Sequence, residues 1–250
     1  LAQPISYGAL TIGIETDFDG CMKLVQKLTS KHSIYLLNSI NSIRIEGQKA
    51  IGIETLHQLE WKVPDWFILP VGNAGNISAL GKGLRELHGL GIINKLPRLA
   101  GIQTKGASPL YESYINGFSD LKPQIAQPTK ASAIQIGDPV SFTKAIRELK
   151  TFDGVVEAVS EAELMNWKAN IDKLGISICP NSSVAIAGTM KLREKNIIKE
   201  NENIVVILTA HGTKFSNTSV EYHADSENKY ANKTMTIKPS LMELEKVLKS

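Results

Sequence analysis

Short apolar runs alternate with longer stretches in which apolar residues recur every three or four positions. A short apolar run bounded by Gly, Pro or polar residues predicts a buried strand, whereas the longer spacing predicts an amphipathic helix. The alternation of the two along one chain indicates an α/β fold with a parallel sheet and flanking helices. We predict strands over residues 9–14, 34–37, 65–71, 98–103, 155–159 and 204–209.

The predicted helices fall between these strands, and several have recognisable starts. Asp17 can cap the first helix through its carboxylate. Ser160 and Glu163 have the spacing of a capping box, and Ser182 is a candidate cap further along the chain. We predict helices over residues 18–30, 44–58, 77–90, 110–114, 139–149, 161–174, 183–194 and 239–248, and irregular structure over 216–236.

The segment from Gly72 through Asn73, Ala74 and Gly75 to Asn76 lies between a predicted strand and a predicted helix. Glycines allow a tight turn and a close approach of the backbone to an anion. The helix that follows offers unpaired N–H groups and the positive end of its dipole. These features predict a phosphate-binding loop, although it has neither the Walker sequence nor Gly-x-Gly-x-x-Gly. The alternative is a Gly- and Asn-rich turn without a ligand.

A second candidate anion site follows the strand predicted at residues 34–37. Asn38 and Ser39 can donate neutral hydrogen bonds, and Arg44 can bind a phosphate through two N–H groups. The alternative is a helix capped by Asn or Ser with a solvated Arg44, and the spacing alone slightly favours that alternative.

Thr209 and His211 lie at the carboxyl end of the last predicted strand, where open α/β sheets bind their ligands. The Thr209 hydroxyl can form a hydrogen bond to a heterocyclic nitrogen without adding charge. A structural role fits the sequence equally well, in which Thr209 caps the strand end and His211 satisfies loop carbonyls. His211 has no visible partner for a role as general base.

Composition excludes several classes of protein. The 250 residues carry 28 Lys and Arg against 25 Asp and Glu, a net charge of +3, and 42% are hydrophobic. These values are those of an ordinary globular protein, and so balanced a charge offers no footprint for nucleic acid. The apolar runs are too short to span a bilayer. Two cysteines without paired histidines predict no metal site and no disulfide framework, and they favour a reducing compartment.

Several longer segments, in the same order along the chain, resemble the threonine synthases and in particular their plant-like branch. These enzymes depend on pyridoxal 5'-phosphate (PLP) and have the tryptophan-synthase β-like fold, PLP fold type II, with a three-layer arrangement of a parallel sheet and flanking helices. The segments are residues 16–24 (TDFDGCMKL), 38–49 (NSINSIRIEGQK), 131–141 (ASAIQIGDPVS) and 209–215 (TAHGTKF).

The resemblance implies a β,γ-replacement in which O-phosphohomoserine loses phosphate and water adds to give L-threonine. It implies that Thr209 faces the pyridine nitrogen and that Asn38, Ser39 and Arg44 hold the substrate phosphate. The cofactor phosphate would rest on Gly72, Asn73, Ala74, Gly75 and Asn76.

The chain departs from the plant-like pattern in two places. Val71 stands where that pattern has the first glycine of Gly-Gly-Asn, and Asn181-Ser182-Ser183 stands where it has His-Thr-Gly after Cys-Pro.

The resemblance also implies a Schiff-base lysine in a Ser-Phe-Lys-Asp type segment, and this chain contains no such segment. We therefore expect that lysine upstream of Leu1 and no catalytic residue within the chain, so that the chain corresponds to a C-terminal portion with the N-terminal part missing. The expected division is residues 1–50 as a remnant of the smaller lobe, 51–216 as the large PLP-binding domain, and 217–250 as an extension with a terminal helix.

The same resemblance suggests a homodimer of the full-length protein, activation by S-adenosylmethionine in plant members, and a location in the bacterial cytoplasm or the plastid stroma. Two alternatives remain: a non-catalytic protein of this fold and a serine/threonine dehydratase-like PLP lyase. Arg44 argues against the second alternative, because the substrates of a dehydratase carry no phosphate.

Overall fold

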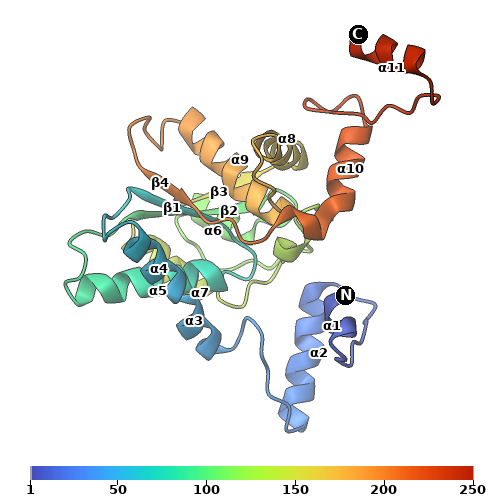
Figure 1. The fold of residues 1–250 in the computed structure, drawn as a ribbon. Helices are drawn as coiled ribbons and strands as arrows, with labels where there is room; N and C mark the ends of the chain where they lie inside the picture. Colours follow the sequence, from blue (N-terminus) through green and yellow to red (C-terminus); the bar gives the residue numbers. More distant parts are fainter. Residues whose placement is uncertain (1, 250) are drawn as a thin grey trace.

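Four parallel strands form the centre of the molecule in the order β3-β2-β1-β4 (Figure 1). The computed structural model describes residues 2–249. Every residue of β1 and β3 is buried, as expected for a parallel sheet with both faces covered. Central β1 pairs with both neighbours, with Trp66 opposite Arg98 on β2 and Ile204 on β4. The strands are β1 (Trp66–Pro70), β2 (Arg98–Thr104), β3 (Val155–Val159) and β4 (Ile204–Val206).

Helices cover both faces of the sheet, which gives the three layers of the predicted α/β class (Figure 1). Side chains of β1 alternate between the faces. Phe67 and Leu69 pack into the core beneath one set of helices, and Trp66 and Ile68 into the core beneath the other. The first set comprises α4 (Ala50–Gln58), α5 (Gly75–Gly89) and α7 (Phe142–Thr151), and the second α8 (Glu161–Asp172) and α9 (Pro180–Glu194).

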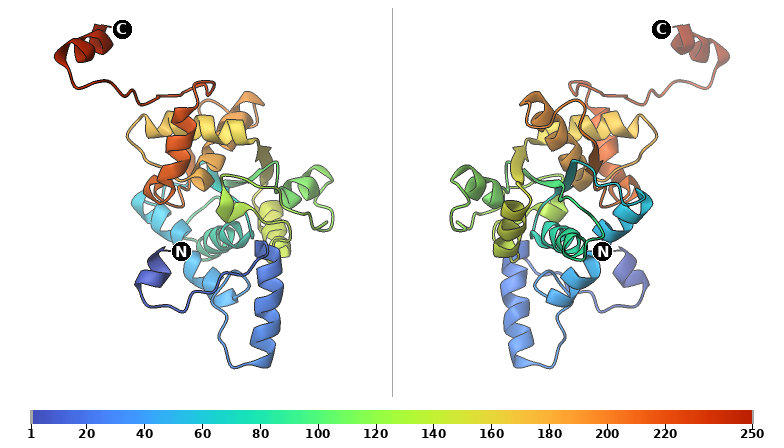
Figure 2. Two further views of the ribbon diagram at one scale, coloured as in Figure 1. Left: turned by 90° about the vertical axis from the view of Figure 1, so that its right-hand side faces the viewer. Right: turned by 90° about the vertical axis from the view of Figure 1, so that its left-hand side faces the viewer.

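The remaining helices belong to neither set. They are α1 (Ala2–Ser6), α2 (Phe18–Lys31), α3 (Ser42–Gln48), α6 (Pro109–Ile115), α10 (Ser216–Ala224) and α11 (Leu241–Lys249), with short 3-10 turns at Ser132–Ile134 and Gly212–Phe215. Among them, α6 packs against β2 and β3 and buries Leu110 in the first core. Figure 2 shows α11 apart from the layers at the end of an extended segment. Within residues 2–249, no helix has the length and apolar character needed to cross a membrane.

Three helix predictions need correction. The helix predicted over 44–58 is two helices that meet at Lys49, and the segment 216–236 begins with helix α10 instead of being irregular throughout. Helix α9 begins at Pro180, because the Cys179 thiol, and not Ser182, accepts the capping hydrogen bond. The capping box of Ser160 and Glu163 is present as predicted.

The strands predicted at residues 9–14 and 34–37 are wrong. Both segments are irregular, and their apolar side chains lie in solvent, with Leu10 90% exposed and Leu37 74% exposed. A strand needs a hydrogen-bonding neighbour, and neither segment has a strand partner among the described residues. The division into residues 1–50, 51–216 and 217–250 stays a prediction.

Candidate active site

Residues of both candidate anion sites line one cavity of about 230 Å³ at the carboxyl end of β1. One wall is the whole loop from Gly72 to Asn76, and Ser39 and Arg44 stand on another. The two segments were separate predictions from sequence, and the fold brings them to a single place. Asn38, the third residue of the predicted substrate site, is not among the lining residues. Its amide contacts the Met22 sulfur at 3.1 Å.

The loop presents the start of helix α5 to this cavity. Ala74 occupies the N-cap position with a left-handed backbone (φ 63°), and no side chain caps the helix there. The backbone at Gly72 packs closely against the backbone at Ile134 and leaves no room for a side chain. A Cβ at position 72 would lie 2.9 Å from the Cα of Ile134. A Cβ at Gly75 would meet only the Ser141 Oγ, at 3.9 Å. The Ile77 N–H already donates to Asn76 Oδ1 at 2.8 Å. The N–H groups of Gly75 and Asn76 and the positive end of the helix dipole are therefore accessible to an anion.

Side chains of the loop hold its shape. The Asn73 Nδ2 donates to Ser39 Oγ at 3.3 Å, and Asn73 Oδ1 accepts the Val140 N–H at 3.3 Å. Asn76 Nδ2 donates to the Pro70 carbonyl at 2.6 Å, which ties the first turn of α5 to the end of β1. Because these amides are engaged within the protein, the backbone of the loop is the part that a phosphate can contact.

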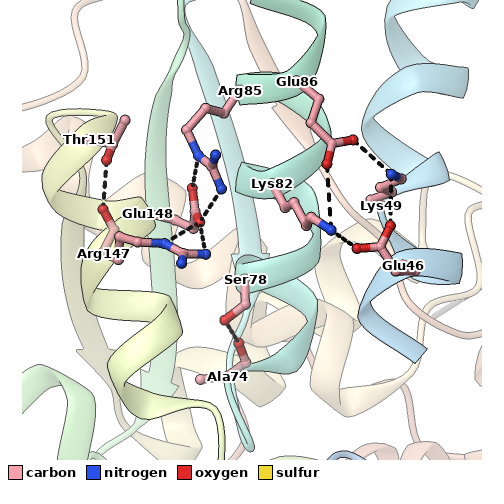
Figure 3. A network of polar contacts seen from close by, with 10 residues as sticks. All are labelled: Glu46, Lys49, Ala74, Ser78, Lys82, Arg85, Glu86, Arg147, Glu148 and Thr151. Carbon is pink, nitrogen blue, oxygen red and sulfur yellow. Dashed lines mark hydrogen bonds and ion pairs between the residues drawn. The ribbon is translucent and has the colours of Figure 1, made fainter. Parts of the chain in front are cut away.

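Charged pairs on both sides of α5 fix the helix to its neighbours (Figure 3). Toward α7, Arg85 of α5 forms an ion pair with the buried Glu148 carboxylate of α7 at 3.1 Å, and Arg147 of α7 pairs with the same carboxylate at 2.7 Å. Toward α3, Lys49 lies 2.7 Å from Glu86. Lys82 of α5 also pairs with Glu46 of α3. Helix α3 carries Arg44, so these pairs set the position of Arg44 relative to the loop.

Arg44 is the cation available to a ligand in this cavity. Its side chain is half-buried, and within residues 2–249 its guanidinium makes no ion pair. A guanidinium without a carboxylate partner can bind a phosphate through two parallel hydrogen bonds.

Thr209 lines a neighbouring cavity of about 440 Å³. Gln48 and Asn76 line both cavities, so the Thr209 cavity adjoins the anion site. The Thr209 N–H donates to Ser182 Oγ at 2.8 Å, and the two hydroxyl oxygens are 3.3 Å apart. Thr209 itself is exposed. A neutral hydroxyl on a fixed backbone can therefore meet a ligand in this cavity.

Cys179 lies behind Thr209 and is fully buried. Burial, the strongest influence, opposes ionisation of the thiol, but hydrogen bonds from Ser182, Thr209 and Asn181 outweigh it and lower the thiol pKa below its ordinary value. His211 caps the 3-10 turn at Gly212–Phe215, since its Nδ1 accepts the Thr213 N–H at 3.2 Å. This role is structural, but it differs from the alternative drawn from the sequence, since His211 accepts an N–H and does not satisfy a loop carbonyl.

Sequence reasoning missed three residues of the site. Gln48 is a polar residue on a helix and has no motif around it. Ser182 and Cys179 belong to the start of α9, where the departure from the plant-like pattern at residues 181–183 was the one available signal. Residues 181–183 are all buried in this structure.

Comparison with known proteins places the chain in a family. The family model described as "Pyridoxal-phosphate dependent enzyme" matches residues 1–210. The chain belongs to this family. It is 48% identical over 225 residues to threonine synthase 2, chloroplastic, of Arabidopsis thaliana, covering 90% of this chain and 44% of that protein. It is 45% identical over 215 residues to threonine synthase of Methanocaldococcus jannaschii, covering 86% of this chain and 53% of that protein. The chain thus spans about half the length of the curated relatives it matches.

Two solved structures share the fold. Threonine synthase from Escherichia coli superposes with a TM-score of 0.68 at 20% identity, covering 93% of this chain and 52% of that one. Serine racemase from Dictyostelium discoideum superposes with a TM-score of 0.63 at 21% identity, covering 83% of this chain and 62% of that one. At these identities the likeness establishes PLP fold type II, as predicted, and not the substrate.

The donor set fits the cofactor that the family uses. The uncapped first turn of α5 and the glycines of the loop suit a phosphate group, and Thr209 suits a heterocyclic nitrogen. None of the described residues lining the two cavities is a lysine.

Proposed function

We propose that the protein to which this chain belongs is a threonine synthase, which converts O-phosphohomoserine and water to L-threonine and phosphate. The single observation that carries the proposal is the shared cavity, where a helix N-terminus and Arg44 serve one site from two sides. An enzyme that uses a phosphorylated cofactor on a phosphorylated substrate needs two such anion-binding elements close together. The identity to plant and archaeal threonine synthases supports the same assignment.

Each residue in this proposal has a physical role. The loop from Gly72 to Asn76 binds the cofactor phosphate through backbone N–H groups. Ser39 and Arg44 bind the phosphate that leaves the substrate, whereas Asn38 contacts Met22 and Ile40 and supports the segment that carries them. Thr209 places a neutral hydroxyl at the pyridine nitrogen. PLP, when bound, supplies an electron sink for the reaction.

The covalent link to the cofactor requires a lysine. We propose that this lysine lies outside the 250 residues, since the lining of both cavities contains none. The chain alone is then inactive, and the half that is shared with the relatives provides the binding elements without the nucleophile. A homodimer, activation by S-adenosylmethionine, and a location in the bacterial cytoplasm or the plastid stroma belong to the same proposal.

A dehydratase-like lyase is the competing function. Such an enzyme binds the same cofactor, but its substrate has no phosphate and gives Arg44 no partner. A non-catalytic protein of this fold would need neither anion site.

Substitution of Arg44 tests the proposal. In the full-length enzyme, Arg44→Ala should weaken the binding of O-phosphohomoserine about tenfold or more, because a charge-assisted hydrogen-bonded pair is lost. The same substitution should change the affinity for PLP less than about threefold. Steady-state kinetics and PLP titration measure the two effects. Lys27→Ala is the control, since it removes one positive charge from an exposed site on α2 away from the cavity lining. Equal losses for substrate and cofactor would contradict the two-site assignment.

A further inference from the structure

Ser182 is the side chain on which Thr209 rests. It lies in the first turn of α9 with no exposed surface. Its Oγ accepts the Thr209 N–H at 2.8 Å and the Ala210 N–H at 3.5 Å. The same oxygen lies 3.3 Å from Thr209 Oγ1 and 3.1 Å from Cys179 Sγ. One buried hydroxyl therefore has four polar neighbours.

The hydrogen-bonding capacity of a hydroxyl decides how these contacts are shared. A serine hydroxyl has one proton and two acceptor lone pairs. The N–H groups of Thr209 and Ala210 occupy both lone pairs of Ser182. Ser182 can then only donate, either to Thr209 Oγ1 or to Cys179 Sγ. In either case Thr209 cannot donate its own proton to Ser182.

The other polar neighbour of the Thr209 hydroxyl is Cys179 Sγ, at 3.8 Å. Sulfur is a weak acceptor, and this sulfur already accepts the Ser182 N–H at 3.3 Å. Thr209 is exposed and lines the 440 Å³ cavity. A sulfur atom at 3.8 Å is a poorer acceptor than a ring nitrogen, so the Thr209 proton can leave this contact for a ligand in the cavity.

Resting on the function proposed above, we propose that Ser182 is a positioning residue that holds the Thr209 hydroxyl as a donor toward an unprotonated ring nitrogen of the cofactor. A protonated ring nitrogen would have to donate its N–H to Thr209 Oγ1. It would then compete with the Ser182 hydroxyl, which can donate its proton to the same oxygen. The arrangement therefore selects a pyridine over a pyridinium.

The test compares two cofactor analogues on the full-length protein freed of PLP. They are 4'-deoxypyridoxine 5'-phosphate and its 1-deaza counterpart, in which C–H replaces the ring nitrogen. Neither has an aldehyde, so neither requires a lysine. Calorimetric titration gives a Kd for each, and their ratio is the nitrogen preference. A purely structural loss weakens both analogues alike and leaves this ratio unchanged.

We expect the wild-type protein to prefer the nitrogen analogue about fivefold, the value of one net hydrogen bond. Ser182→Ala should reduce the preference below twofold while both analogues still bind. Ser182→Thr should retain it. Ser183→Ala is the matched control: Ser183 is equally buried on the same turn, and its hydroxyl donates to the Pro180 carbonyl at 2.8 Å. This control should keep the wild-type ratio.

The outcomes separate this inference from the proposed function. If the folded wild-type protein binds neither analogue, the cofactor site itself is wrong. If both bind and Ser182→Ala keeps the wild-type preference, the role of Ser182 is refuted and the site stands. Should Ser182→Ala not fold, Ser182→Cys replaces it, since a thiol of similar size accepts and donates weakly. A fivefold preference in Ser182→Cys would overturn the inference equally.

Discussion

Replacing Gly83 with alanine should move the α3–α4 junction away from α5. Gly83 is buried in the middle of α5, and a Cβ there would lie 2.6 Å from the Lys49 carbonyl oxygen. Ordinary contact begins at 3.4 Å, so the junction must retreat by about 0.8 Å, the difference between these two distances. The obstacle is backbone, which cannot rotate aside as a side chain can.

The expected cost follows from two opposing effects. Overpacking of this kind costs about 1–3 kcal/mol, while alanine gains up to about 1 kcal/mol over glycine inside a helix. Gly89→Ala, at the end of the same helix, has nothing within 4 Å of the added Cβ. Comparing the two variants largely cancels the helix-propensity gain, and the difference reports the clash.

We therefore expect Gly83→Ala to be less stable than Gly89→Ala by about 1–3 kcal/mol, or roughly 2–12 °C in Tm. Thermal and urea unfolding measure this difference. Since Arg44 is on α3, Gly83→Ala should also weaken phosphate binding at Arg44, measured by titration with inorganic phosphate. Equal Tm values for the two variants would refute the close packing of α3 and α5.

Two further predictions concern the covalent link and the response to acid. Borohydride reduction of the chain with PLP should label no single lysine, and mass spectrometry showing one specific adduct with turnover would show that the nucleophile lies within these residues. Burial raises the pKa of Glu163, but hydrogen bonds from Ser160 and the charge of Lys191 outweigh this and lower the pKa below its ordinary 4.5. A carboxylate with a lowered pKa stabilises the fold above pH 4.5, and this contribution is lost as the pH falls. The Tm of Glu163→Gln should therefore fall less than the Tm of the wild type between pH 6 and pH 3.5. An equal fall in both proteins would show that the charge of Glu163 does not contribute to the stability of the capping box.

The central sheet was predictable because its strands are short and mostly apolar, even where β3 carries Glu157 and β2 carries Gln103. Trp66–Pro70 is buried along its whole length, and such a run has few alternatives in a chain that alternates with amphipathic helices. Residues 9–14 have a similar composition but no strand partner within the described residues. An apolar run shows that a segment can form a strand and does not show whether a neighbour is present.

The candidate site was predictable in its parts and not in its assembly. Local spacing identified the loop from Gly72 to Asn76 and the segment with Arg44, because each depends on a strand followed by a helix. The hydrogen bond between Asn73 and Ser39 joins residues 34 positions apart, and no local pattern encodes that distance. The contact between Ser182 and Thr209 could not be predicted for the same reason, since the two residues are 27 positions apart.

The amide of Asn73 has a consequence for how this site can change by mutation. It binds Ser39 on one side and the Val140 backbone on the other, so one side chain spans the two anion-binding elements. A substitution at Asn73 alters both elements in a single step, and its effect will not add independently to that of a change at Arg44. Under the proposed function, a lineage that exchanged one phosphorylated substrate for another could vary the residues around Arg44 while it kept this amide. Coupling through Asn73 would then restrict the order in which such substitutions could accumulate.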